Sequence, residues 1–214
     1  MSDPADADPL RAYRAELRSR LIAAREALPA DRHAQLSQSI ERHLGALVDV
    51  LAPAVLAFCW PFRDEFDARD LVTARLAGGL RACLPVVVDN GLPLEFREWA
   101  PHSEMVEDRY GIHVPARGET LRPDAILMPL NAFDAAGYRL GYGGGYFDRS
   151  LAALSPRPRA VGVGFELARV DSIRPQPYDL PMDFIVTETG VFVVCEGRLS
   201  LQGLPRHSRA SGNP

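Results

Sequence analysis

An apolar run, Ala125-Ile126-Leu127-Met128-Pro129-Leu130, is followed a few residues later by the glycine-rich segment Arg139-Leu140-Gly141-Tyr142-Gly143-Gly144-Gly145-Tyr146-Phe147-Asp148-Arg149. The apolar run is typical of a buried strand. Glycines let a backbone turn sharply, and their N–H groups can approach an anion closely. Arginines form paired hydrogen bonds with phosphate oxygens, and an Asp beside such a loop suits a phosphate-bound Mg²⁺. The combination favours a phosphate-binding loop over an ordinary glycine-rich surface turn.

The composition bounds the class of protein. With 214 residues, 47% of them hydrophobic, the chain can form one large domain, which we expect over residues 1–203, with a disordered tail over 204–214. No apolar run approaches the length of a membrane span, and residues 1–6 are acidic, unlike a secretory signal. A net charge of −4 argues against a nucleic-acid binder. We therefore expect a cytoplasmic protein without a membrane or nucleic-acid partner.

The residue types present exclude several kinds of catalytic and binding site. All 24 basic residues are arginine, so a Schiff-base lysine and a P-loop lysine are both impossible, and any phosphate contact must come from arginine, backbone and metal. The three cysteines, Cys59, Cys83 and Cys195, have no CxxC spacing and are interpreted as small hydrophobic residues. The five histidines are scattered and are interpreted as surface residues. The glycine segment does not fit the register of a dinucleotide-binding fingerprint, which argues against a dehydrogenase.

Periodicity along the chain predicts an α/β protein. Asp8-Pro9 is a helix start, and apolar residues then recur at three- and four-residue spacing until Pro29. A second helix is expected over 31–48, a third over 68–80 and a short one over 146–154. Strands are expected over 55–60, 82–88, 92–99, 125–130, 160–165, 184–187 and 191–194. Alternating strands and helices favour a three-layer α/β/α fold with a largely parallel sheet, preceded by an N-terminal helical pair. In such sheets ligands bind beyond the carboxyl ends of the strands.

Polar residues at these expected strand ends and helix starts are candidates for a site. Arg14 and Arg18 lie four residues apart, hence on one helix face, although a solvated charged face is the simpler interpretation. Glu65 follows a buried strand and Asp179 precedes another; each could equally be an ordinary loop carboxylate or turn former. Each signal alone is modest.

Taken together, these elements resemble the 5-formyltetrahydrofolate cyclo-ligase family, also called methenyltetrahydrofolate synthetases. The resemblance covers residues 10–195 and is carried by Arg14-x₂-Leu17-Arg18, Trp60-x₄-Glu65, Pro129-x₃-Phe133-Asp134-x₂-Gly137-x-Arg139, the glycine segment to Arg149, Asp179-x₃-Asp183 and Thr187-Glu188. The glycine segment is its most specific part. It implies the three-layer fold shared with sugar-phosphate isomerases and CoA transferases. It also implies an enzyme that uses MgATP to convert 5-formyltetrahydrofolate to 5,10-methenyltetrahydrofolate, ADP and phosphate.

The resemblance also implies roles for individual residues. Arg139, Tyr146 and Asp148 are the expected catalytic residues, and Asp148 and Asp179 the expected Mg²⁺ ligands. Trp60, Glu65 and the segment Tyr142–Tyr146 are expected to contact the folate, with Glu65 binding the pterin's amino and ring N–H groups. ATP contacts are expected from Arg14, Arg18, Arg139, Leu140, Gly141, Tyr142, Gly143, Gly144, Gly145, Tyr146 and Phe147. The expected partners are reduced folate and ATP alone, for a monomer or weak homodimer.

Some positions depart from the family pattern. Arg14 stands where many members have lysine, and Phe147 where a tyrosine is usual. Ala68, Val114 and Ala168 replace polar residues on the expected folate side. These three keep two alternatives open: a relative that binds folate or nucleotide without catalysis, or an enzyme that activates another N-formyl compound with ATP. A sugar-phosphate isomerase is the weakest alternative, because the lysine of its usual catalytic pair is missing.

Overall fold

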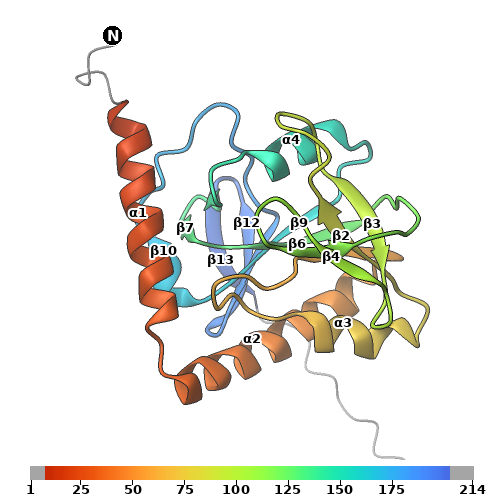
Figure 1. Cartoon of the computed structure of the whole chain (residues 1–214). Helices are drawn as coiled ribbons and strands as arrows, with labels where there is room; N and C mark the ends of the chain where they lie inside the picture. The colour runs from red at the N-terminus through yellow and green to blue at the C-terminus, as the bar shows by residue number, and fades with distance from the viewer. Residues whose placement is uncertain (1–7, 203–214) are drawn as a thin grey trace, which may run out of the picture.

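The structure is a computed structural model, and it describes residues 8–202. An eight-stranded sheet forms its centre (Figure 1). Its order is β13-β12-β11-β9-β6-β1-β2-β3, with β1 Val55–Ala57, β2 Arg81–Val86, β3 Glu95–Trp99, β6 Ala125–Pro129, β9 Arg159–Val163, β11 Phe184–Thr187, β12 Gly190–Cys195 and β13 Arg198–Gln202. The inner strands β2, β1, β6, β9 and β11 are parallel, and the antiparallel strands lie at the two edges. The expected largely parallel sheet is confirmed.

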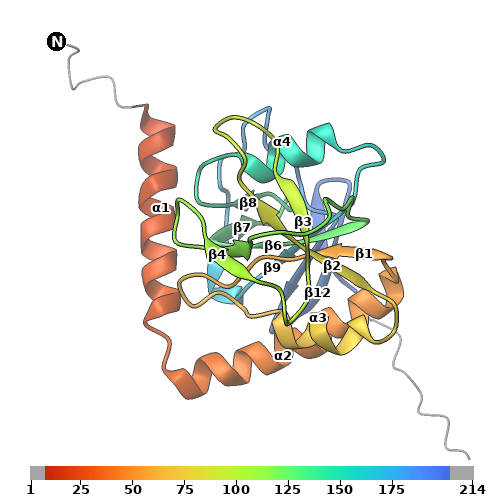
Figure 2. The ribbon, with the colours of Figure 1, turned by 45° about the vertical axis from the view of Figure 1, so that its right-hand side comes forward.

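Helices cover both faces of this sheet (Figures 1 and 2). α2 (Ala30–Leu51) and α3 (Arg69–Leu76) lie on one face, and α4 (Tyr146–Ala153) lies on the other. Successive residues of a strand face opposite sides. Leu56 and Leu127 accordingly pack with α2, whereas their neighbours Ala57 and Ile126 pack in a second cluster with Leu151 of α4. The two clusters form the two cores of the expected three-layer architecture.

α1 (Pro9–Glu26) stands beside the sheet rather than on it. It begins as the sequence predicts, with the Asp8 carboxylate accepting a hydrogen bond from the N–H of Leu10 at 3.0 Å. Its apolar stripe, with Leu17 and Leu21, packs against a small second sheet of order β10-β7-β8, formed by Arg169–Val170, Ala132–Asp134 and Arg139–Leu140. α1 is therefore tied to the strand that leads into the glycine segment.

Several boundaries differ from the expected ones. β1 ends at Ala57 instead of Trp60, so residues 58–60 already belong to the loop that carries the candidate site. α3 spans only eight residues, ending before a Gly-Gly pair. The β7–β8 hairpin between β6 and the glycine segment, and a second hairpin of β4 (Met105–Glu107) and β5 (His113–Pro115), were not expected. Nor were β10, β13 and the short 3₁₀ helix η1 (Glu166–Ala168). Most of these segments have only two or three residues, too few to show a period.

Within residues 8–202, no helix combines the length and the apolar character that crossing a membrane requires. The expected disordered tail over 204–214 lies outside the described residues. The assignment of residues 1–203 to a single domain stays a prediction.

Candidate functional site

The glycine segment forms a loop between β8 and α4. Gly143 and Gly145 adopt φ values of 98° and 64°, a region that favours glycine. Gly145 also precedes the first residue of α4, so the loop ends at a helix N-terminus, where free N–H groups favour an anion. Arg18 donates from Nε to the carbonyl of Gly141 at 2.7 Å, and a Cβ added to Gly143 would lie 3.2 Å from Arg18 Nη2. Helix α1 thus supports the loop beside Gly143, where the positive φ favours glycine.

Arg139 enters the site because of strand register. Phe133 pairs with Arg139 and Ala132 with Leu140, so Leu140 points into the core beside α1 and Arg139 points to the opposite face of the hairpin. Arg139 is buried, and its Nη2 donates to Asp148 Oδ2 at 3.4 Å. Its Nε is also buried and has no hydrogen-bond partner among the described residues. Buried polar groups are almost always hydrogen-bonded, so this donor is suited to a ligand acceptor.

The two expected metal ligands lie in segments that contact one another. Asp148 Oδ1 accepts a hydrogen bond from the N–H of Leu180 at 3.1 Å, and Leu180 directly follows Asp179. The Asp179 carboxylate is bound at both oxygens by the Arg14 guanidinium and also accepts from the N–H of Gln176 at 2.6 Å. Each aspartate is therefore paired with one of the expected phosphate contacts. Carboxylate oxygens suit Mg²⁺, but no group of three His, Cys, Asp or Glu side chains converges within residues 8–202. Phosphate oxygens and water would have to complete the coordination.

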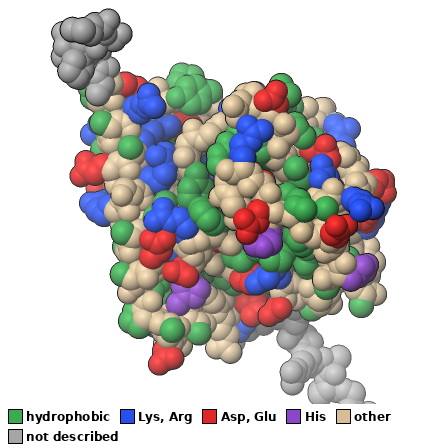
Figure 3. Space-filling view, viewed as in Figure 1, with side chains coloured by type: hydrophobic (Ala, Val, Ile, Leu, Met, Phe, Trp, Pro, Cys, Tyr) green, Lys and Arg blue, Asp and Glu red, His purple; other side chains and the backbone are tan. Residues whose placement is uncertain are grey.

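Arginines gather along α1 (Figure 3). Arg14 donates to the carbonyls of Ile173 at 3.2 Å and Arg174 at 2.9 Å, in addition to its pair with Asp179. Burial, and secondarily the positive charge of Arg14, lower the pKa of Arg18. Arg14 and Arg18 thus lie on one face of the helix, Arg14 bound to the loop before β11, where Asp179 balances its charge, and Arg18 bound to a carbonyl of the glycine loop.

Glu65 and Tyr142, expected on the folate side, are in direct contact. The Tyr142 hydroxyl donates to Glu65 Oε1 at 2.7 Å, and the N–H of Phe62 donates to Oε2 at 3.2 Å. Glu65 is 7% exposed. Burial raises the pKa of Glu65, while the hydrogen bonds of Tyr142 and Phe62 and the charge of Arg25 oppose that rise. Desolvation of its hydroxyl end, together with the negative charge of Glu65, raises the pKa of Tyr142, although the residue as a whole is 41% exposed. The loop after β1 and the glycine loop are thus joined by a charged hydrogen bond.

Trp60 and Tyr146 interact with other side chains, each with an aromatic ring and an arginine. Trp60 stacks on His113 with ring centroids 5.4 Å apart, and the Arg69 guanidinium lies 4.4 Å from its ring. The hydroxyls of Tyr146 and Tyr110 are 2.9 Å apart, and Arg149 lies over the Tyr146 ring. Neither side chain hydrogen-bonds to or stacks on Arg139 or Asp148. The structure therefore brings together Arg14, Arg18, Arg139, Asp148 and Asp179 on one side, and Glu65 with Tyr142 on the other.

Two further aspartates of the family pattern, Asp134 and Asp183, accept hydrogen bonds from the backbone. Asp134 accepts hydrogen bonds from the N–H groups of Ala136, Tyr138 and Ile173. Asp183 accepts from the N–H of Ala160 at 2.7 Å and is paired with Arg157. These carboxylates hold loops in place.

Sequence reasoning missed two buried polar residues of the site. Arg25 is 4% exposed, and its Nη2 lies 3.4 Å from the Tyr142 hydroxyl and 3.8 Å from Glu65 Oε1. Its Nη1 donates at 3.1 Å to Asn131, which is 1% exposed. Arg25 follows Arg18 by seven residues, so the helical period places both on one face and could have identified it. Asn131 follows β6 directly and carries no comparable signal.

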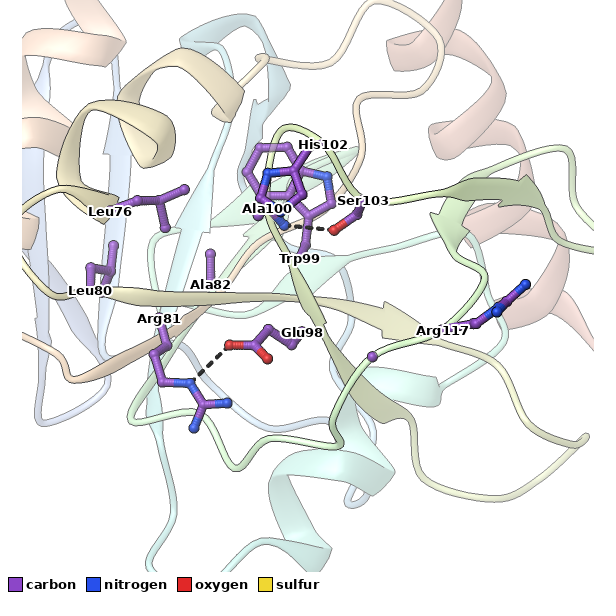
Figure 4. Close-up of a pocket in the computed structure, with 11 residues that line it drawn as sticks. Leu76, Leu80, Arg81, Ala82, Glu98, Trp99, Ala100, His102, Ser103 and Arg117 are labelled. Carbon is purple, nitrogen blue, oxygen red and sulfur yellow. Dashed lines mark hydrogen bonds and ion pairs between the residues drawn. The ribbon is translucent and has the colours of Figure 1, made fainter.

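Of the three departures from the family pattern, one adjoins a site residue. Ala68 lines a small cavity of about 20 Å³ together with Cys59 and Glu65. Val114 and Ala168 are both buried, and Ala168 lies in the apolar cluster that includes Phe133. A larger open pocket, of about 390 Å³, lies elsewhere, at the start of β2 and the end of β3 (Figure 4). Its wall carries the Arg81–Glu98 ion pair and Trp99, and it shares no residue with the expected site.

Comparisons with known proteins identify relatives of the chain. The chain is 29% identical over 175 residues to the 5-formyltetrahydrofolate cyclo-ligase of Escherichia coli (strain K12), an alignment that covers 78% of this chain and 96% of that protein. The corresponding protein of Mycolicibacterium smegmatis (strain ATCC 700084 / mc(2)155) is 27% identical over 183 residues, covering 81% and 93%.

Solved structures show the same fold. The solution structure of Aquifex aeolicus 5,10-methenyltetrahydrofolate synthetase superposes with a TM-score of 0.73 at 29% identity, covering 91% of this chain and 98% of that chain. The synthetase from Mycoplasma pneumoniae gives a TM-score of 0.69 at 23% identity, covering 82% and 98%. The model of the 5-formyltetrahydrofolate cyclo-ligase family matches residues 11–188. A match over most of the chain, including both sides of the site, places this protein in that family: the chain is a member of the 5-formyltetrahydrofolate cyclo-ligases.

Proposed function

We propose that this cyclo-ligase converts 5-formyltetrahydrofolate and ATP to 5,10-methenyltetrahydrofolate, ADP and phosphate. The observation that carries the proposal is the meeting of a glycine loop at a helix N-terminus with the buried Arg139, which pairs with Asp148 and whose Nε donor lacks a partner among the described residues. That combination suits a triphosphate. The family membership supplies the folate substrate and the ligase chemistry.

The reaction is expected in two steps. A formamide carbon is a poor electrophile, because its nitrogen donates electron density into the carbonyl. The formyl oxygen attacks the γ-phosphorus, the bond to the ADP oxygen breaks, and the formyl oxygen becomes part of a phosphate leaving group. N10 then attacks the formyl carbon, loses its proton and expels phosphate, which closes the ring. The protein's main task is to position the γ-phosphate against the formyl oxygen, which can lower a barrier by roughly 7–11 kcal/mol.

Different residues would bind different parts of the two substrates. Arg14, Arg18, Arg139 and the N–H groups of the loop would hold the phosphates, and Tyr146 would orient the reacting groups. Asp148 and Asp179 would hold Mg²⁺, which neutralises phosphate charge when bound. Glu65 and Trp60 would hold the pterin. On binding ATP, Arg14 and Arg139 would exchange carboxylate partners for phosphate oxygens, which are the same type of acceptor.

The proposed partners are small molecules alone, with the protein acting in the cytoplasm as a monomer or weak homodimer. The net charge of −4 supports the lack of a nucleic-acid partner. Light scattering of the purified protein measures the oligomeric state, and a stable tetramer or larger assembly would contradict this part of the proposal.

The decisive experiment follows near-ultraviolet absorbance of the purified protein with 5-formyltetrahydrofolate and MgATP, because the methenyl product absorbs there and the substrate does not. Signal growth that requires both ATP and Mg²⁺ supports the reaction, and Asp148→Asn should remove it. Asp171→Asn, an exposed aspartate in the loop before β11, is the matched control and should keep it. A flat trace from folded protein, with folate binding by calorimetry, would indicate the non-catalytic alternative. Turnover of a different N-formyl compound alone would indicate another substrate.

A further inference from the structure

We propose that Arg25 is a positioning residue for folate binding: its buried guanidinium joins the turn of residues 61–65, the Asn131 amide and the Tyr142 hydroxyl, and so fixes the Glu65 carboxylate. The inference rests on the proposed function, because it assigns Arg25 to the folate side of that site. It concerns a residue that neither the motifs nor the family pattern singled out.

Arg25 is buried in a way that needs explanation. Arginine is almost never fully buried unless it is paired and hydrogen-bonded. Its Nε donates to the carbonyl of Arg63 at 2.9 Å, and its Nη1 donates to the carbonyl of Leu130 at 3.4 Å and to Asn131 Oδ1 at 3.1 Å. Its Nη2 faces the Tyr142 hydroxyl and Glu65. One planar group thus joins α1, the loop after β1, the end of β6 and the glycine loop.

The turn that carries Glu65 depends on this support. Arg63 and Asp64 are consecutive non-glycine residues with φ of 52° and 55°, a conformation that L-residues rarely adopt. Strained residues of this kind persist only where their surroundings hold them, and they cluster at ligand sites. Besides the bond from Arg25, the Arg63 side chain pairs with Glu26 at 2.6 Å, and a ring nitrogen of His33 lies 3.0 Å from the carbonyl of Asp64. The junction of α1 and α2 therefore holds the turn at three points.

The chemistry of the donors fixes the direction of the chain of hydrogen bonds. A guanidinium only donates, and an ionised carboxylate only accepts. The Tyr142 hydroxyl must therefore accept from Arg25 and donate to Glu65, so the three side chains form a single relay from cation to anion. The same rule orients Asn131, whose Oδ1 faces Arg25 and whose Nδ2 is left buried without a partner among the described residues.

The charge of Arg25 also acts on the protonation of Glu65. The groups that face Glu65 are Arg25 from α1, Tyr142 from the glycine loop and Cys59 from the loop after β1, with the Phe62 N–H from its own turn. Arg25 is the cation among them, and it lowers a pKa that burial raises. A ligand that donates N–H groups needs the ionised carboxylate. Removal of Arg25 should therefore move the acidic limb of folate binding to higher pH.

The test compares Arg25→Met and Arg25→Lys with Arg20→Met, which removes an exposed arginine from the same helix. Arg25→Met should raise KM for 5-formyltetrahydrofolate at least tenfold, about 1.4 kcal/mol, with KM for ATP within about twofold of wild type. In the profile of kcat/KM against pH, the acidic limb of Arg25→Met should move to higher pH. Arg25→Lys keeps the charge but cannot span all of these partners, so it should raise KM for folate with little movement of the limb. Arg20→Met should match wild type.

A double-mutant cycle separates positioning from general stability. In the Glu65→Gln background, Arg25→Met should change KM for folate by less than about threefold, because its target is gone. The inference is wrong if Arg25→Met raises KM for folate by the same factor in the wild-type and Glu65→Gln backgrounds. It is also wrong if Arg25→Met and Arg25→Lys both keep the wild-type KM and pH profile. If Arg25→Met does not fold, the Arg25→Lys comparison decides alone. Absence of turnover in wild type and Arg20→Met would instead reject the proposed function.

Discussion

Arg14 and Asp179 form a two-point ion pair that connects helix α1 to the loop before β11. The family pattern assigns the first to ATP phosphate and the second to Mg²⁺, yet in this structure each neutralises the other. The Arg139–Asp148 pair repeats the arrangement across the site. Both pairs join an expected phosphate contact to an expected metal ligand, so these charges are balanced in the structure, and under the proposed function MgATP would exchange with these partners.

Asp179→Asn should therefore weaken MgATP binding and lower stability. Loss of the charged pair and of a charged acceptor for Gln176 should cost about 1–3 kcal/mol. MgATP at 100 times its Kd should stabilise wild type by about 2.7 kcal/mol, and this increment should shrink in the variant at the same concentration. Thermal unfolding with and without MgATP measures both effects. The control is Asp171→Asn; an undiminished increment in Asp179→Asn would remove Asp179 from the metal site.

Arg139→Lys should lower kcat strongly although the charge is kept. The Arg139 fork donates to Asp148 and leaves Nε free for a ligand acceptor, and a lysine ammonium cannot reproduce that geometry. Loss of one preorganised contact should reduce kcat by about 10²–10³. Steady-state kinetics at saturating ATP and folate measure the change, with circular dichroism to verify folding. A kcat within threefold of wild type would show that Arg139 only supports the fold.

Gly143→Ala should weaken ATP binding beyond its effect on stability. The alanine Cβ would meet Arg18 Nη2 at 3.2 Å, and φ of 98° is unfavourable for alanine. Gly197→Ala is a matched control, because Gly197 also has positive φ, 70°, but its Cβ would meet nothing within 4 Å. Both variants should lose about 1–2 kcal/mol of stability from backbone strain, and only Gly143→Ala should raise KM for ATP. Equal KM values for the two would indicate that the loop does not contact ATP.

The helices, the parallel sheet and the glycine loop were predictable because each is a local pattern: apolar spacing, a helix cap, or a run of glycines. The pairing of Arg14 with Asp179, 165 residues apart, is not local. The family resemblance assigned Arg14 to ATP and Asp179 to Mg²⁺ without showing that the two side chains meet. The same holds for Arg25, which acts through the carbonyl of Arg63 and two side chains from other loops. Short strands such as β8, with two residues, were missed because they contain only a single period of alternation, which does not stand out from chance.

The contribution of Glu65 to the free energy of unfolding should decrease as pH rises. Burial raises the pKa of Glu65 in the folded protein above its ordinary value of 4.5, so the folded state binds this proton more tightly than the unfolded chain does. The resulting stability is fully present below pH 4.5 and is lost as pH rises through the folded pKa. The free energy of unfolding of wild type minus that of Glu65→Gln should therefore fall as pH rises from 4.5. Urea unfolding at several pH values measures it; a difference that increases with pH would mean that the hydrogen bonds to Glu65 outweigh its burial.

Trp60 fluorescence should report folate binding directly. The chain has two tryptophans; Trp99 is 5% exposed and packs edge-on against Phe58, whereas Trp60 lies in the loop after β1, stacked on His113. His113 and the Arg69 guanidinium both lie against the indole of Trp60, so a pterin that stacks on this ring must displace one of them. In Trp99→Phe, which leaves Trp60 alone, 5-formyltetrahydrofolate should therefore quench the emission with a saturable titration curve.

The reciprocal variant, Trp60→Phe, leaves only the buried Trp99 and should show little saturable quenching, since Trp99 borders the pocket at the opposite end of β2 from the candidate site. It should also bind folate more weakly, because an aromatic contact of this kind contributes about 0.5–1.5 kcal/mol. His113→Ala supplies a second check: with the stack removed, quenching by folate should persist and the emission of free Trp60 should change. If instead Trp60→Phe retains the quenching and Trp99→Phe loses it, the folate lies against the pocket of Trp99, and Glu65 and Tyr142 do not form its binding site.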